Sequence, residues 1–268
     1  MIGASLGLCL RKTGICREII GVARHDATIR KALKIGAISK GEADLKKAVS
    51  GADLVILAAP VNAIKDVLRD IGKKIESGCL VFDVGSTKKE ILAAAKKFLN
   101  KNSFFIGTHP MAGSEKSGPE FARADLFRDS ITFVVRPAGA DKDAFSRVCA
   151  LWQKTGSRVH EIKAQEHDSI VAQISHLPHI LSAALVNSVA PARLKFAAGG
   201  FKDTTRIAGG EINMWADILL TNKKEVLRSL FSLEKEIARI KKSVSAGNTA
   251  ALLRELKAAK QKRDSLNG

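Results

Sequence analysis

The sequence contains no tyrosine, and aromatic residues make up only 5% of its 268 positions. Proteins that bind single-stranded nucleic acids stack the bases on aromatic side chains beside basic ones, and no basic run in this chain is interleaved with aromatics. The four cysteines are scattered and form no CxxC pair, which indicates a reducing compartment and argues against a metal site for zinc. These shortages disfavour a single-strand-binding platform and a zinc domain, and they favour a cytoplasmic location.

Long apolar runs are also lacking. No such run approaches the about 20 residues of a membrane helix, although 46% of the residues are hydrophobic, as in ordinary globular proteins. The apolar start, residues 1–10, has no basic stretch before it and no small-residue cleavage site after it. We therefore expect neither a secretory signal nor a membrane segment.

Positive charge, in contrast, is abundant, and the formal net charge is +17. This charge has three interpretations. The lysines can form a solvated surface, they can draw anionic small molecules toward a cleft, or they can bind nucleic acid. The low aromatic content argues against the last interpretation, and we expect no nucleic-acid partner.

Strand-like and helix-like segments alternate over the first part of the chain. The strand-like segments are almost continuously apolar, as in strands that are buried on both faces. This alternation predicts an α/β, Rossmann-like fold, a doubly wound parallel sheet with helices on both faces. The expected strands are residues 18–23, 53–59, 79–83, 104–107, 130–135 and 158–162, and the expected helices are residues 4–12, 26–34, 62–74, 87–100 and 141–155.

The pattern changes after the last expected strand, since no further strand signal follows it. We expect a first domain of residues 1–162 and an all-helical domain of residues 163–268. A long apolar helix is expected over residues 165–189, with Pro178 kinking it or starting its second half. A glycine-rich loop is expected over residues 199–206.

The helix expected over residues 223–245 carries a regular apolar stripe. The apolar positions are alternately four and three residues apart, which is a heptad pattern suited to a partner helix. This pattern predicts an obligate homodimer that forms through the C-terminal helices, the last of which is expected over residues 249–263. The stripe consists of Val226, Leu230, Leu233, Ile237, Ile240 and Val244.

A polar loop, Thr108–Gly118, follows the strand expected over residues 104–107. Pro110 and the glycines of this loop are expected to exclude regular structure. In open α/β sheets, ligands bind beyond the carboxyl ends of the strands, so His109 lies where chemistry would be done. The alternative is that His109 only caps the strand and bonds the backbone.

The start of the chain contains part of a dinucleotide-binding pattern. Gly3 fits the third glycine of G-x-G-x-x-G at the start of a helix, which would place the first two glycines before Met1. About 20 residues further on, where NAD-selective sites carry an acid, the chain has Ala23 and Arg24. A guanidinium can pair with the 2′-phosphate of NADP, so we expect NADP, with NAD as the alternative cofactor. Arg24 could instead be an exposed loop residue.

The first strand of such a sheet is central, between the second strand and the fourth. Without it, we expect residues 18–23 and 53–59 to form one half-sheet and residues 79–83 and 104–107 another, with unpaired backbone groups facing the gap. We therefore expect a truncated chain, whose natural form begins roughly ten residues earlier with a β-branched strand and a Gly-x-Gly turn.

Four motifs stand in order along the chain: DVGSTK at residues 83–88, THPMAGSEKSG at residues 108–118, SHLPH at residues 175–179 and GGFKDTTRIA at residues 199–208. With these motifs, which span most of its length, the chain resembles the prephenate/arogenate dehydrogenase family of tyrosine biosynthesis. The resemblance implies a nucleotide-binding domain, then a helical domain that dimerises. It implies oxidative decarboxylation of prephenate to 4-hydroxyphenylpyruvate, or of arogenate to tyrosine, with hydride transfer to a nicotinamide cofactor.

The resemblance also implies roles for individual residues. His109 resembles the catalytic histidine, which accepts the proton of the ring hydroxyl, and Ser86 would bond the same hydroxyl. Arg206 resembles the arginine that grips a substrate carboxylate. His176 and His179 can share one helical face; we place His179 at the substrate and favour a satisfied buried histidine for His176. The resemblance adds Ser114, Lys202 and His176 as substrate-binding candidates, and Gly3, Ser5, Arg24, Ala59, Pro60, Val61 and Ser86 as cofactor-binding candidates.

Three other functions remain as alternatives. The first is a degenerate, non-catalytic dimer, against which the joint presence of Ser86, His109 and Arg206 argues. The second is a nucleic-acid-binding protein, and the third is a related β-hydroxyacid dehydrogenase, whose catalytic lysine has no counterpart inside the long helix. No acid is clearly placed to pair with the ammonium group of arogenate, and His179 weakly favours prephenate.

Overall fold

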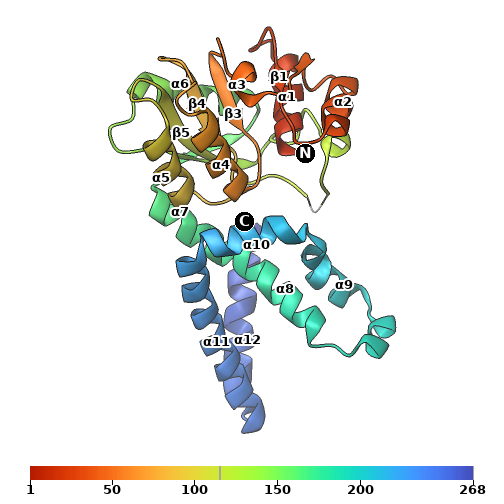
Figure 1. Cartoon of the computed structure of the whole chain (residues 1–268). Helices are drawn as coiled ribbons and strands as arrows, with labels where there is room; N and C mark the ends of the chain where they lie inside the picture. The colour runs from red at the N-terminus through yellow and green to blue at the C-terminus, as the bar shows by residue number, and fades with distance from the viewer. Residues whose placement is uncertain (115, 268) are drawn as a thin grey trace. The chain divides into compact units, whose positions relative to one another are not determined.

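The computed structural model describes residues 1–114 and 116–267, so that Glu115 of the predicted loop lies outside the described residues (Figure 1). The chain divides into two compact units, the first from Met1 to Asn222 and the second from Lys223 onward. The first unit contains both sheets and most of the helices, whereas the second is helical.

The main sheet has five strands in the order β3-β4-β5-β6-β7. Neighbouring strands are parallel, apart from β6, which runs antiparallel to β5. The α/β prediction is confirmed, with this one departure from a wholly parallel sheet. The strands are β3 (Leu54–Leu57), β4 (Leu80–Asp83), β5 (Phe104–Pro110), β6 (Ile131–Val135) and β7 (Arg158–Glu161).

Helices cover both faces of this sheet because successive side chains of a strand point to opposite faces. Val81 of β4 is buried in one core with Ile64 of helix α4, whereas Phe82 is buried in the other core with Leu6 and Trp152 of helices α1 and α6. The sheet is therefore doubly wound. The covering helices are α4 (Val61–Ile71) and α5 (Lys89–Phe98) on the first face, and α1 (Ile2–Lys12) and α6 (Lys142–Lys154) on the second.

A separate two-stranded parallel sheet pairs β1 (Ile20–Gly21) with β2 (Lys40–Gly41). The prediction that residues 18–23 and 53–59 form one half-sheet is wrong. Strand β1 pairs with β2, and β3 pairs with β4. Strand β2 was not predicted, because it has only two residues and no apolar side chain. Helix α1 packs on both sheets, since Leu6 is buried in the main core and a Cβ on Gly7 would collide with the carbonyl oxygen of Ala37, just before β2. Helices α2 (Asp26–Lys34) and α3 (Leu45–Ala48) complete this region.

The long helix expected after the sheet is interrupted in its middle. A five-residue π-helical segment, η2 (Ala172–His176), separates α7 (Ala164–Val171) from α8 (Leu177–Asn187). Pro178 is the second residue of α8 and cannot donate a backbone hydrogen bond, and the π-helical segment lies directly before this break in the bonding pattern. The prediction that Pro178 starts the second half of this helix is confirmed.

The same stretch, Ala164–Asn187, is long and apolar enough to span a membrane by length and composition alone, with a mean hydropathy of 1.4. The sequence predicted this helix but not that its length and hydropathy would suit a membrane span. Its polar side chains His167, Asp168 and His176 are buried and hydrogen-bonded within the first unit. These bonds tie the helix to the rest of the first unit, and 28% of its apolar window is buried.

The prediction of a glycine-rich loop over residues 199–206 is wrong. These residues form helix α9 (Gly199–Thr205), which continues into the 3-10 segment η4 (Arg206–Gly209). The glycines stand at the helix start, and the Thr204 hydroxyl donates to the carbonyl of Gly200 within the helix at 2.8 Å. A 3-10 segment η3 (Pro191–Phe196) precedes α9, and helix α10 (Ile212–Thr221) follows η4; Pro119–Phe121 (η1) and Ser265–Asn267 (η5) are also 3-10 segments.

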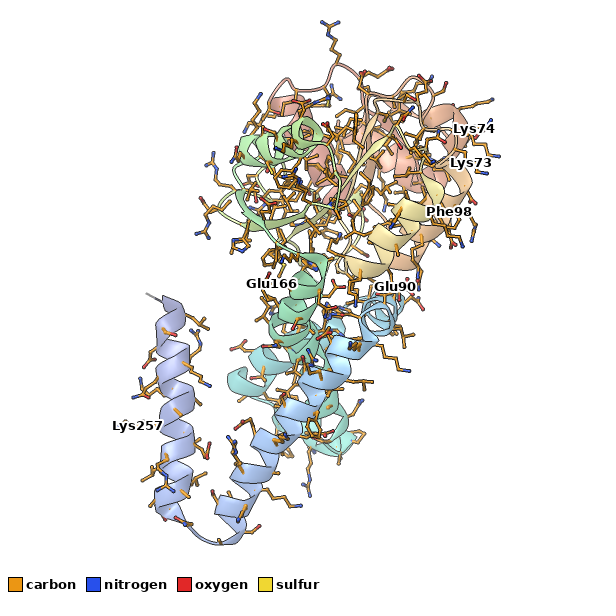
Figure 2. All side chains as sticks on the ribbon, turned by 90° about the vertical axis from the view of Figure 1, so that its left-hand side faces the viewer. Lys73, Lys74, Glu90, Phe98, Glu166 and Lys257 are labelled. Atoms are coloured by element: carbon orange, nitrogen blue, oxygen red, sulfur yellow. The ribbon has the colours of Figure 1, made fainter. Side chains whose placement is uncertain are left out.

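The second unit consists of α11 (Lys223–Ser245) and α12 (Thr249–Asp264), which run in opposite directions (Figure 2). The bounds of α11 are those that the sequence predicted. Apolar side chains of both helices remain exposed in the single chain, among them Ile237, Ile240, Val244, Leu253 and Leu256.

Candidate active site

His109 lies at the carboxyl end of β5, inside the strand rather than in a loop. The predicted loop starts too early, because β5 continues to Pro110 by pairing with the antiparallel strand β6. Proline has no N–H to donate, but none is needed at position 110. The ladder bond at this end of β5 is made by the amide of Met111, which donates to the carbonyl of Ile131 at 2.7 Å. The side chain of His109 is 9% exposed, so it is buried close to the edge where ligands of such sheets bind.

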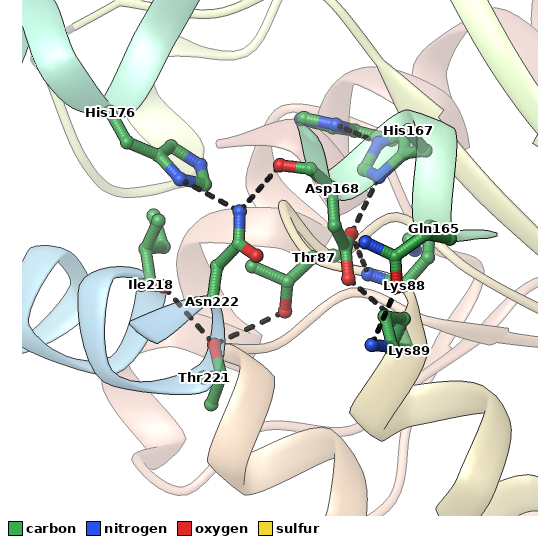
Figure 3. Close-up of polar contacts among 12 residues, drawn as sticks. Thr87, Lys88, Lys89, Gln165, His167, Asp168, His176, Ile218, Thr221 and Asn222 are labelled. Carbon is green, nitrogen blue, oxygen red and sulfur yellow. Dashed lines mark hydrogen bonds and ion pairs between the residues drawn. The ribbon is translucent and has the colours of Figure 1, made fainter. Parts of the chain in front are cut away.

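A hydrogen-bonded chain runs inward from His109. Its Nδ1 atom lies 2.9 Å from Nε2 of His167, and Nδ1 of His167 lies 2.8 Å from Oδ1 of Asp168. Figure 3 shows His167 and Asp168 on α7, beside the start of α5. Neither residue was singled out from the sequence, because a histidine next to an aspartate on a helix is no specific signal.

Burial and neighbouring groups keep the two imidazoles of this chain neutral. Burial lowers the pKa of His109 well below its ordinary value, and His167, Lys88 and His176 add to the shift. Burial also lowers the pKa of His167, against the opposing effect of its bond to Asp168. His109 is therefore an uncharged imidazole at neutral pH, which is the state that can accept a proton.

The ends of β4 and β5 are joined by a buried ion pair. The ammonium group of Lys88 contacts the carboxylate of Asp83 and donates to the carbonyl of Thr108 at 2.6 Å, and both charged side chains are fully buried. Burial lowers the pKa of Lys88, and Asp83 opposes that shift. This pair fixes the strand that carries His109 relative to the strand that precedes Ser86.

Ser86 itself lies half-buried in the short segment between β4 and α5. This segment is held at both ends: the amide of Gly85 donates to Asp83 at 2.8 Å, and the amide of Lys88 donates to Asp168 at 2.8 Å. The carboxylate of Asp168 is thus linked to His109 through His167, and it also accepts from the Lys88 amide, two residues after Ser86 (Figure 3).

His176 and His179, which can share one helical face, both contact Trp215 of α10. His179 stacks on the indole, with ring centroids 3.7 Å apart, whereas His176 meets it edge-on at 6.3 Å. His176 is 1% exposed, and its Nδ1 accepts from the side-chain amide of Asn222 at 3.3 Å. It fits the favoured interpretation of a satisfied buried histidine.

His179 differs from His176 in its hydrogen bonding. Within the described part of the chain, its buried Nδ1 has no hydrogen-bond partner. Trp215 was missed from the sequence, where a single tryptophan on an apolar helix looks like a core residue. A Cβ on Gly210 would lie 2.5 Å from Nε1 of Trp215, so only glycine lets the chain pass beside the stack.

Arg206 and Lys202 are exposed residues on elements that pack against α8, the helix of His179. Lys202 lies within α9 and Arg206 begins η4. The hydroxyl of Ser182 on α8 donates to the carbonyl of Thr204 at 3.1 Å, which ties the helix of His179 to the helix before Arg206. The sequence-predicted groups His179 and Arg206 are thus carried by elements that pack together.

The proposed cofactor residues lie at two helix starts. A Cβ on Gly3 would lie 2.8 Å from Cβ of Ala58 just after β3, so glycine permits the close helix–strand packing typical of dinucleotide folds. Neither α1, whose N-cap is Met1, nor α4, whose N-cap is Pro60, has a side-chain cap. Open helix starts of this kind bind phosphate, and the residues present therefore fit a dinucleotide.

The other predicted cofactor residues are placed as follows. Arg24 is exposed just before α2, Ala59 is half-buried, and Val61 is buried as the first residue of α4. Ser5 is fully buried, and its hydroxyl accepts from the amide of Arg123 at 3.1 Å, so it holds a loop rather than facing a ligand.

Ser114, predicted at the substrate, is exposed with its hydroxyl 3.6 Å from Sδ of Met1, at the start of α1. The structure thus places it beside the helix start of the proposed cofactor site. Among residues 1–114 and 116–267, no group of three or more His, Cys, Asp and Glu side chains is arranged to hold a metal ion.

Comparisons with known proteins agree on one family. Residues 6–161 match the nucleotide-binding domain of prephenate dehydrogenase, and residues 163–258 match its dimerization domain. The chain is 36% identical to the prephenate dehydrogenase of Bacillus subtilis, over 99% of this chain and 74% of that protein.

Solved structures extend the comparison to the fold. The prephenate dehydrogenase of Aquifex aeolicus in complex with hydroxyphenyl propionate and NAD+ superposes with a TM-score of 0.92, at 30% identity, over 99% of this chain and 94% of that one. The arogenate dehydrogenase of Synechocystis gives a TM-score of 0.83 at 27% identity, over 99% of this chain and 96% of that one.

Proposed function

Because this chain belongs to the prephenate dehydrogenase family, we propose that it catalyses the NAD(P)-dependent oxidative decarboxylation of prephenate to 4-hydroxyphenylpyruvate. The observation that carries this proposal is the buried, neutral imidazole of His109 at the carboxyl end of β5. A parallel-stranded sheet binds ligands at that end.

His109 is the proton acceptor in this proposal. Its Nδ1 is engaged with His167, so Nε2 is the atom that takes the proton from the ring hydroxyl of the substrate. Ser86, held between the Gly85 and Lys88 amides, orients the same hydroxyl. A bound nicotinamide would supply the acceptor for the hydride that leaves the hydroxyl-bearing carbon. Loss of carbon dioxide makes the substrate ring aromatic, so the chemistry needs no metal to hold electrons.

The substrate carboxylates and ring contact the helical part of the first unit. Arg206 forms a bidentate pair with a carboxylate, which suits its planar guanidinium, and Lys202 adds positive charge beside it. His179 contacts the substrate side chain, with Trp215 holding its imidazole in place and the buried His176 meeting the indole edge-on. The high net charge draws the dianionic substrate toward this site.

NADP is the proposed cofactor in preference to NAD. The support is Arg24, an exposed guanidinium after β1 at the position where an acid would repel a 2′-phosphate. The open starts of α1 and α4, beside Gly3 and Pro60, would hold the phosphates.

A homodimer through the C-terminal helices completes the proposal. Its support is the row of exposed apolar side chains on α11 and α12, and the dimerization-domain match over residues 163–258. In this proposal residues 1–162 bind the dinucleotide, residues 163–268 bind substrate and dimerise, and the enzyme works in the cytoplasm, where its four cysteines stay reduced.

The test is the turnover of prephenate and of arogenate by one purified sample, with NADP and with NAD. We expect prephenate with NADP to have the highest kcat/KM. A preference for arogenate would make the chain an arogenate dehydrogenase, the function of the Synechocystis relative. Turnover of neither substrate would support the degenerate dimer instead.

A further inference from the structure

The hydrogen-bonded chain behind His109 ends on a carboxylate that touches no proposed ligand. Asp168 is 1% exposed and His167 is fully buried. The two residues are adjacent on α7, whereas His109 lies 58 positions earlier in the sequence than His167. Burying a carboxylate is costly unless its oxygens accept hydrogen bonds.

Donor and acceptor roles in this chain follow from the carboxylate. Both oxygens of Asp168 accept backbone N–H groups, Oδ1 from Lys88 at 2.8 Å and Oδ2 from Lys89 at 3.1 Å. An ionised carboxylate can only accept, so Nδ1 of His167 must donate to it. A neutral His167 then has a lone pair on Nε2, which accepts from Nδ1 of His109. The lone pair of His109 is consequently left on Nε2.

We propose that Asp168 is a positioning residue that, through His167, sets the ring tautomer of His109 and so makes Nε2 of His109 the proton-accepting atom. This inference rests on the proposed function of His109 as the base. It assigns roles to two residues that the proposed reaction does not otherwise need.

The hydrogen-bonded chain from His109 through His167 to Asp168, here called the relay, also supplies a counter-charge when His109 becomes protonated. The groups that face His109 are the imidazoles of His167 and His176 and the ammonium of Lys88, all of which disfavour a positive charge on it. The carboxylate of Asp168, one imidazole away, is the acceptor at the end of the chain, and Asp83 is paired with Lys88. The charge that forms on His109 is thus balanced by Asp168 through His167.

The first variant is Asp168→Asn, which keeps the shape of the side chain. An amide has one accepting oxygen and one donating nitrogen, so it cannot accept from His167 and both backbone amides at once. Because Lys88 and His167 both donate to Oδ1, an amide oxygen in that place keeps both bonds and the tautomers but removes the negative charge. In the reverse orientation, the amide nitrogen donates to His167, the tautomers of both imidazoles reverse, and Nε2 of His109 carries a proton. We expect kcat to fall roughly a hundredfold or more, within the range of a lost general base, with KM changed less than about threefold.

A purely structural role of Asp168, holding the start of α5, would also lower the activity, so a second variant separates the two roles. In His167→Gln, the amide oxygen can accept from Nδ1 of His109 without a carboxylate behind it. Adding Asp168→Asn to His167→Gln should then lower kcat by less than about threefold, since the relay is already bypassed. The matched control is Glu166→Gln, an exposed carboxylate on the same helix, which should leave kcat unchanged (Figure 2).

The second measurement needs no substrate. Proton–nitrogen correlation spectra of the imidazoles, recorded with 15N-labelled histidine, report which ring nitrogen carries the proton, and His109→Asn identifies the signals of His109 among the six histidines. We expect His109 protonated on Nδ1 in the wild type, and a shift of its proton to Nε2 in the fraction of Asp168→Asn whose amide nitrogen faces His167. A wild-type His109 protonated on Nε2, or an Asp168→Asn loss of equal size in both backgrounds, overturns the proposal. If the wild type turned over neither substrate, the proposed function would fail, and the spectra would still decide the tautomer.

Discussion

The imidazole of His179 stacks on the indole of Trp215, with ring centroids 3.7 Å apart and planes inclined by only 9°. The two rings come from α8 and α10, which are separated in the chain by α9 and two 3-10 segments. Trp215 is in turn anchored toward the sheet, because Asp217 of the same helix accepts from the side-chain amide of Asn62 on α4 at 2.7 Å. Helix α10 therefore contacts both proposed binding regions. Its Trp215 stacks on His179, which is proposed for the substrate, and its Asp217 bonds α4, whose start is proposed for the cofactor.

His109→Asn should leave cofactor binding intact and lower kcat by roughly two to four orders of magnitude, the usual contribution of a general base. Steady-state kinetics and calorimetric NADPH titration measure the two effects. His160→Asn, an exposed histidine on β7, is the control and should change neither. Wild-type turnover of His109→Asn at neutral pH would rule out the assigned role.

Arg206→Ala should raise KM for prephenate far more than it lowers kcat, because an arginine that grips a carboxylate contributes equally to ground-state and transition-state binding. Initial-rate measurements over a range of prephenate concentrations separate the two constants. Arg193→Ala, an exposed arginine of η3, should leave both unchanged. A defect in kcat alone would place the action of Arg206 elsewhere.

The double change Ala23→Asp with Arg24→Ala should reverse the cofactor preference from NADP to NAD. It removes the guanidinium for the 2′-phosphate and introduces an acid that bonds the ribose hydroxyls of NAD. The ratio of kcat/KM for the two cofactors is the measurement, with Arg17→Ala as the control. Equal use of both cofactors by the wild type would contradict the prediction.

The pair Ile237→Asp with Ile240→Asp should convert a dimer into a monomer, because charges on the exposed stripe of α11 would be buried in the interface. The two isoleucines are 50% and 41% exposed in the single chain. Sedimentation equilibrium at micromolar concentration distinguishes the two states, and Lys241→Glu on the same helix serves as the control. A wild type that sediments as a stable monomer would refute the dimer.

The free energy of unfolding should fall as the pH drops from about 6.5 toward 4, partly because of His176. Burial lowers the pKa of His176 from 6.5 to about 4, with Asp168 opposing the shift and His167 and His179 adding to it. Between these values the unfolded chain binds a proton that the folded chain does not, so acid favours unfolding. The contribution lost between pH 7.5 and pH 5 is roughly 2 kcal/mol.

Urea unfolding at several pH values measures this slope. His176→Asn should make it shallower, since its amide oxygen can still accept from Asn222 but does not titrate. His25→Asn, an exposed histidine before α2, should leave the slope unchanged. Identical slopes for His176→Asn and the wild type would show that His176 does not contribute.

The sequence by itself determined the elements that have a periodic or local signal. Continuous apolar runs predicted β3 to β5, and the heptad stripe predicted the bounds of α11. The strand before His109 was enough to place this residue at the carboxyl end of a sheet. In contrast, β2 has two residues and no apolar side chain, and the glycines of α9 look like a loop because a helix start tolerates them.

Only the tertiary structure decided which side chains of the proposed active site hydrogen-bond or stack with one another. The bond from the Lys88 amide to Asp168 spans 80 positions in the sequence and that from His109 to His167 spans 58, and Trp215 meets His179 across three intervening helical segments. No local pattern encodes such pairs, because a buried histidine or aspartate is placed by whichever elements pack together. Spacing along the chain predicted that His109 would lie at the sheet edge, whereas packing of α7 against α5 and β5 determined which of its nitrogens is engaged.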